Sequence, residues 1–161
     1  MAAATVSNRV MSPTLGVDFS ATPTTQGFTL GARAWSPDAE YVYVQANGAI
    51  TLGDWVAIDE DFQAAAGTKA LADVGHTVAF AQVAFADNDF GWVAVRGRNI
   101  NCRLASVCAA DVALFTTATA GVLDDISTSQ TKIAGVRSVV TITNSHASEI
   151  IANYPKIAES P

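Results

Sequence analysis

From Phe28 onward, the chain alternates short runs of aromatic and β-branched residues with turn residues. Residues 40–45 form such a run, and the Asn47-Gly48 pair that follows is typical of a hairpin turn, because both residues accept a positive φ. Further strands are predicted at residues 49–52, 55–58, 77–85, 90–95, 100–106, 112–115, 132–142 and 149–154. So many short strands at even spacing predict an all-β barrel or sandwich.

Two other features refine this prediction. Residues 77–85 are largely apolar on both faces, which indicates a central or covered strand. The one predicted helix is a short turn at residues 62–66, closed by Gly67.

A weak internal sequence similarity, called the sequence echo below, links residues 53–58 with 110–114 and residues 80–83 with 133–136. Two similar β units in one barrel would produce this echo, and so would convergent strand composition.

The first 27 residues follow no such pattern. Ser, Thr, Pro and Gly recur there, and the apolar residues Val10, Leu15, Val17 and Phe19 have neither strand nor helix spacing. The sequence therefore predicts an extended arm at residues 1–27 and one β-barrel domain at residues 28–161. Such an arm either becomes ordered on a partner or is a terminus without a role.

Composition supports a single packed domain. The chain has 161 residues, of which 50 % are hydrophobic and only 15 % charged, and its mean hydropathy is +0.26. This length is enough for a core without metal or disulfide staples. The high hydrophobic fraction and the low charged fraction exclude disorder for most of the chain and indicate that some apolar surface is covered by another chain.

Charge and hydropathy also limit the partners. The formal net charge is −6, so nucleic acid is not expected as a partner. No apolar run is long enough for a membrane helix, and the start of the chain lacks the pattern of a signal peptide. A soluble, unexported protein made in a cytoplasm is expected.

The residues that carry chemistry form no recognisable catalytic set. His76 and His146 lie near no nucleophile signature, and the acidic residues cluster in predicted turns, where they cap their own backbone. Asp87-Asn88-Asp89 lacks the glycine and the distal glutamate of a calcium loop. Cys102 and Cys108 are too few for a disulfide framework or a metal site and are expected to be buried or half-buried free thiols. We therefore expect no enzyme activity, no cofactor and no metal.

Large apolar and aromatic residues are better candidates for function. Several aromatic side chains fall at strand ends, where a ring either plugs a barrel or anchors a contact between chains. The residues predicted to contact another chain, either a second subunit or a partner, are Leu15, Val17, Phe19, Arg33, Trp35, Tyr41 and Trp92.

An ordered series of segments resembles a known family. The most distinctive is Asp89-Phe90-Gly91-Trp92-Val93-Ala94-Val95-Arg96-Gly97. The others are 30–33, 41–46, 53–56, 83–84 with Asp87, 110–117 with 120–124, 132–136 and 154–157. Together they resemble the small β-rich capsid decoration, or cement, proteins of tailed bacteriophages over about residues 28–157. The arm and the two cysteines depart from that family.

The resemblance implies a β-barrel or β-tulip-like fold and a structural role without catalytic residues. It implies a homotrimer or dimer on the outer surface of the icosahedral head of the virion, where the protein binds and stabilises the lattice of the major capsid protein. Two alternatives are a component of the phage tail tube, fibre or spike, and a carbohydrate-binding module in which Trp35 or Trp92 stacks on a sugar ring.

Overall fold

The computed structural model describes residues 17–143 and 146–158 and confirms the all-β fold. Its strands are β1 (Arg33–Trp35), β2 (Ala39–Ala46), β3 (Trp55–Ile58), β4 (Gln63–Ala66), β5 (Thr77–Ala81), β6 (Phe90–Leu104), β7 (Ala113–Thr116), β8 (Val122–Asp124), β9 (Lys132–Ser138) and β10 (His146–Ile157). A short helix, α1 (Lys69–Asp73), lies between β4 and β5. Within the described residues, no helix is long and apolar enough to cross a membrane.

Five of these strands close into a barrel. The ring runs β2-β4-β3-β5-β6 and returns to β2, with one parallel pair, β2–β4, among antiparallel neighbours. Alternate side chains from all five strands fill its interior, because successive residues of a strand point to opposite faces. This interior cluster is aliphatic apart from Phe85 and includes Val42, Val44, Val56, Ile58, Ala64, Ala79, Val93 and Val95.

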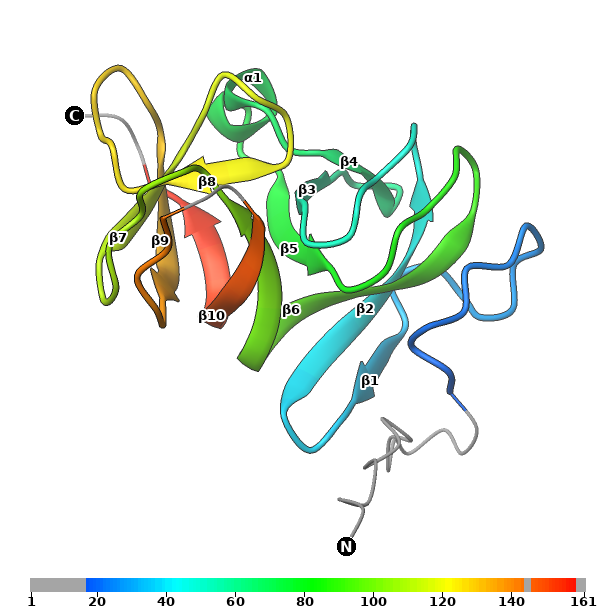
Figure 1. The fold of residues 1–161 in the computed structure, drawn as a ribbon. Coiled ribbons are helices and arrows are strands. Elements are labelled where there is room, and N and C mark those ends of the chain that lie inside the picture. The colour runs from blue at the N-terminus through cyan, green and yellow to red at the C-terminus, as the bar shows by residue number, and fades with distance from the viewer. Residues whose placement is uncertain (1–16, 144–145, 159–161) are drawn as a thin grey trace, which may run out of the picture.

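Five further pairings close a second ring in the same order. It runs β6-β8-β7-β9-β10 and returns to β6, and its one parallel pair is β6–β8. Figure 1 shows β6 passing from one ring into the other. The segments of the sequence echo occupy equivalent places in the two rings, because 53–58 and 110–114 lead into β3 and β7, while 80–83 and 133–136 lie in or beside β5 and β9.

Strand β6 serves both interiors because its two faces belong to different buried clusters. Val93 and Val95 point into the first ring, whereas Ile100 and Cys102 belong to the buried cluster of the second. The even-numbered residues Trp92 and Ala94 belong to the same cluster as Ile100 and Cys102, so one face of β6 packs outside the first ring and continues inside the second. The pairing of β6 is irregular on both sides of Gly97, with one extra residue against Glu40–Tyr41 of β2 and another against Ile150–Ala152 of β10, and such bulges bend a strand. The two strands predicted at 90–95 and 100–106 are therefore one strand of 15 residues.

The helix predicted at residues 62–66 is wrong. Residues 63–66 form β4, which pairs with β3 from Val56 opposite Ala66 to Ile58 opposite Ala64. The alanine-rich sequence favours a helix locally, but closing the barrel needs a strand here, and tertiary pairing overrides a weak local propensity. The helix instead follows Gly67, and the side chain of Thr68 caps it by accepting a hydrogen bond from the Leu71 amide.

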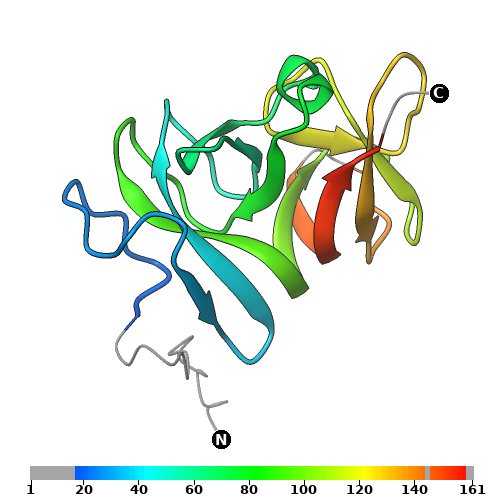
Figure 2. The same ribbon diagram turned by 180° about the vertical axis from the view of Figure 1, so that it is seen from behind.

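Residues 17–27, predicted as part of an arm, lie along the outer face of the first ring (Figure 2), where Val17 and Phe19 join the buried cluster. Phe19 stacks on Tyr41 with ring centroids 4.1 Å apart and meets the edge of Trp92 at 5.6 Å. Phe28 adds further edge contacts to Tyr43 and Trp92. Because Val17 and Phe19 are buried, the packed domain already includes residue 17 rather than beginning at residue 28.

Candidate contact surface

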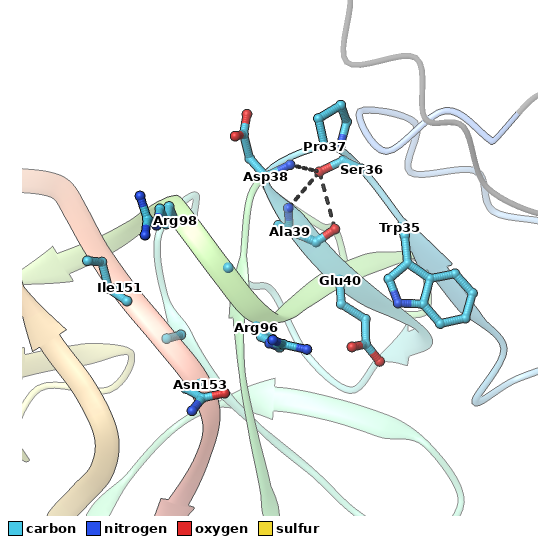
Figure 3. Close-up of a pocket in the computed structure, with 12 residues that line it drawn as sticks. Trp35, Ser36, Pro37, Asp38, Ala39, Glu40, Arg96, Arg98, Ile151 and Asn153 are labelled. Carbon is cyan, nitrogen blue, oxygen red and sulfur yellow. Dashed lines mark hydrogen bonds between the residues drawn. The ribbon is translucent and has the colours of Figure 1, made fainter.

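A polar surface with exposed aromatic rings lies where β1 and β2 approach β6 and β10. A cavity of about 530 Å³ opens there, lined by residues of the β1–β2 turn, the middle of β6 and residues 151–153 of β10 (Figure 3). A second cavity of about 390 Å³ lies beside it. The name seam surface is used below for Arg33, Trp35, Glu40, Arg96, Arg98, Tyr154 and Lys156.

Gly97 allows the strands to meet at this surface. It pairs with Ala39 of β2 on one side and Ala152 of β10 on the other. Its φ is +143°, and an added Cβ would lie 2.2 Å from the Asp38 carbonyl oxygen and 2.6 Å from the Ala39 Cα. Only glycine combines this backbone conformation with so close an approach.

The turn between β1 and β2 positions Trp35. The Ser36 amide donates to the Ala39 carbonyl at 2.7 Å, and the Ser36 Oγ accepts from the Ala39 amide at 2.9 Å. Pro37 and Asp38 complete the turn, as expected for residues with these backbone preferences. The indole of Trp35 is left 43 % exposed beside Glu40 (Figure 3).

A bulge in β10 positions Tyr154. Between Ala152 and Lys156 the pairing with β9 shifts register, and Tyr154 has a left-handed φ of 46°. Gly135 lies opposite with φ +80°, where a Cβ would lie 2.9 Å from the Asn153 carbonyl oxygen. The bulge leaves the Tyr154 ring 44 % exposed, with the Arg96 guanidinium 5.4 Å from its centroid.

Glu40 links these parts although it is only 6 % exposed. Its Oε1 accepts from Arg33 Nη1 at 2.7 Å, and its Oε2 accepts from the Tyr154 hydroxyl. Burial raises the pKa of Glu40, but the hydrogen bonds from Tyr154, Arg33 and Trp35 and the Arg33 charge outweigh it, so that the pKa lies below its usual value. Glu40 is therefore a carboxylate at neutral pH and holds the side chains around it in place.

The predicted contact residues divide into two groups. Arg33 and Trp35 come together on the seam surface. Val17, Phe19, Tyr41 and Trp92 are between 2 % and 8 % exposed and pack against the protein's own core, so they offer little surface to a second chain in this conformation. Leu15 lies outside the described residues.

Sequence reasoning did not select Glu40 or Arg96 as contact residues. Glu40 and Tyr154 are 114 positions apart, and only the closure of both rings brings them together. The one local signal is the position of Glu40, a charged residue at the start of the aromatic strand run at 40–43. A carboxylate at a strand position that is otherwise apolar needs a hydrogen-bonding or charged partner.

The two cysteines are free and buried, as predicted. Burial, followed by the nearby Asp125 and Asp124 charges, raises the pKa of Cys108 to about 11, and burial also raises the pKa of Cys102. Both are therefore protonated thiols with little nucleophilic character at neutral pH. The part of the chain that the structure describes contains no group of three or more His, Cys, Asp or Glu residues able to hold a metal ion.

Comparison with known proteins adds no relative. No protein-family model matches the sequence, and no curated protein matches it.

Proposed function

We propose that this protein is a structural component of a virion, a decoration protein that binds the outer surface of an icosahedral head and reinforces the lattice of the major capsid protein. The resemblance of its sequence to the cement proteins supports the proposal. The observation that carries it is the pair of exposed aromatic residues, Trp35 and Tyr154, held beside one another by Glu40.

Such rings are suited to binding a protein surface. Aromatic residues dominate the energy of many interfaces, and a side chain already held in one position loses less entropy on binding. Tyr154 is fixed by its hydrogen bond to Glu40, and Trp35 by the tight turn that follows it. The seam surface therefore offers two anchors on a rigid double ring.

The edge strand β1 lies on the same side. Among the described residues β1 has a single neighbour in the sheet, β2. The hydrogen-bonded pair of Ser36 and Ala39 sets the antiparallel alternation, which turns the backbone of Arg33 and Trp35 away from β2. An extended segment of a partner could pair with this edge. Many such contacts repeated over a closed lattice add up to strong attachment through avidity.

Binding to purified capsids tests the proposal. The wild-type chain should sediment with heads that lack it, and Trp35→Ala should bind about tenfold more weakly. Leu52→Ala is the matched control, because Leu52 is 41 % exposed in a turn outside the seam surface and should bind as the wild type does. No binding of the wild-type chain to heads would overturn the proposal, and binding to tails instead would favour a tail component.

A carbohydrate-binding module is the second candidate. The Trp35 ring favours it, because the ring is exposed beside a cavity that is also lined by two carboxylates and two arginines. Trp92, the other residue considered for stacking on a sugar, is 2 % exposed and is not accessible. A glycan array with the wild-type chain and Trp35→Ala tests this function, and retention of neutral glycans that is lost in the variant would favour it over capsid binding.

A further inference from the structure

The cations of this acidic chain are distributed unevenly. Four of the described lysines and arginines are in ion pairs: Arg33 with Glu40, Lys69 with Asp73, Arg103 with Asp54 and Arg137 with Asp111. In residues 17–143 and 146–158, the four that remain outside an ion pair are Arg96, Arg98, Lys132 and Lys156. Three of these four, all but Lys132, lie on the seam surface.

The seam surface consequently has a charge opposite to that of the chain. Its two cavities are lined by four lysines and arginines, whereas Asp38 and Glu40 are the two acidic residues that line them. The charge of Glu40 is already matched by Arg33 at 2.7 Å. The formal net charge of the whole chain is −6. An approaching anion therefore meets a local positive site on a protein that is negative overall.

We propose that the seam surface binds the carboxylate groups of an acidic, extended segment of a partner protein. The proposal rests on the capsid-binding function and names the chemistry that the partner presents there. Arg96 and Arg98 offer planar guanidinium groups, which bind carboxylates with paired hydrogen bonds, and Lys156 adds a third cation in the cavity that Tyr154 also lines. Trp35 and Tyr154 cover the apolar parts of the same segment.

A long polyanion such as duplex nucleic acid fits this surface less well. The positive site is small, and the negative charge of the rest of the chain would repel phosphates that extend beyond it. A short segment with a few carboxylates between apolar side chains matches both the charges and the two exposed rings.

Titration of the full chain with two capped six-residue peptides tests this chemistry. One peptide alternates aspartate with leucine, and the other has asparagine in place of aspartate. The aspartate peptide should shift the indole NMR signal of Trp35, the asparagine peptide should bind about tenfold more weakly, and added salt should weaken only the former. Equal affinity for both peptides, or no shift with the aspartate peptide at millimolar concentration, would overturn the inference.

Charge reversal locates the binding site. Arg98→Glu should weaken binding of the aspartate peptide about tenfold. Lys132→Glu makes the same change of charge at the unpaired cation outside the seam surface and should leave the affinity unchanged. If the two variants behave alike, the carboxylates do not bind at the seam surface.

The same variants separate this inference from the proposed function. Should heads bind Arg98→Glu as tightly as the wild type while Trp35→Ala is lost, capsid binding stands and the acidic partner segment is rejected. Should heads fail to bind the wild type while the aspartate peptide still binds in a manner sensitive to Arg98→Glu, the carboxylate site stands and the capsid function is rejected.

Discussion

Asp54 and Arg103 form an ion pair that joins the two rings. Arg103 Nη1 of β6 donates to Asp54 Oδ1 at 2.6 Å, and the Asp54 side chain is only 3 % exposed. The backbone repeats the connection, because the Arg103 amide donates to the Gly53 carbonyl at 2.7 Å. Gly121 packs so closely on Asp54 that a Cβ there would lie 2.2 Å from its Oδ1. The turn before β3 in the first ring is thus bound to the part of β6 that belongs to the second ring.

Asp54→Asn should lower the free energy of unfolding by about 2 kcal/mol, because it leaves the Arg103 charge without its partner. The loss should be smaller than for a fully buried pair, since the Arg103 side chain is 30 % exposed. Urea unfolding of Asp54→Asn, Arg103→Gln and the double variant measures this loss. The sum of the losses in unfolding free energy of the two single variants should exceed the loss of the double variant.

Asp111→Asn is the control for that measurement. Asp111 precedes β7 as Asp54 precedes β3, and it pairs with Arg137, but these two side chains are 67 % and 51 % exposed. An exposed pair contributes little, so the loss should stay below about 0.5 kcal/mol. Equal losses for Asp54→Asn and Asp111→Asn would contradict the role of Asp54 in fastening the rings.

Gly97→Ala should destabilise the protein by more than about 2 kcal/mol, because the new Cβ would clash with backbone that cannot move without opening the junction of β2 and β6. Gly48→Ala separates this clash from backbone strain. Gly48 also has a positive φ, +94°, but an added Cβ there meets nothing within 4 Å. Its cost should be only about 1 kcal/mol by the same thermal or chemical unfolding. Equal costs would show that the close approach at Gly97 is unimportant.

Phe19→Ala tests whether residues 17–27 belong to the folded domain. Removing the ring that stacks on Tyr41 and meets Trp92 should cost about 3 kcal/mol and should change the tryptophan fluorescence of the native state. Ile126→Ala, at a residue that is 59 % exposed, should cost less than about 0.5 kcal/mol. A Phe19→Ala variant as stable as the wild type would mean that the segment adds nothing to the core.

Local patterns in the sequence predict where the strands of this fold lie better than they predict how the strands pair into closed rings. The run at 55–58 is β3, and the glycine at 97 correctly marks an interruption, yet the interruption is a bulge within one long strand. Whether a glycine ends a strand or bends it depends on the strands beside it, here β2 and β10, which pair with β6 from distant parts of the chain.

The same limit applies to the candidate site. Phe19 and Trp92 have the composition of contact residues, but their partner is the protein's own barrel, because the residues before β1 fold back over Tyr41 and Tyr43. Trp35 could be selected from its place beside a turn. The importance of Glu40 could not, because it depends on a tyrosine on the last strand. Pairings across so many positions leave no mark in local periodicity.

The stability that Glu40 contributes should disappear in acid. Its pKa in the folded protein lies below the ordinary value of 4.5, so the carboxylate stabilises the native state above that value, and the contribution is lost as pH falls through the folded pKa. Glu40→Gln should therefore be about 1–2 kcal/mol less stable than the wild type at neutral pH, and the difference should shrink as the pH falls below the ordinary pKa of a glutamate. Tyr154→Phe, which removes one hydrogen bond to the carboxylate, should raise the pKa of Glu40 and move this loss to higher pH. Urea unfolding of the three chains across this range measures both effects, and a difference between wild type and Glu40→Gln that persists or grows in acid would show that the charge of Glu40 is not what holds the seam surface together.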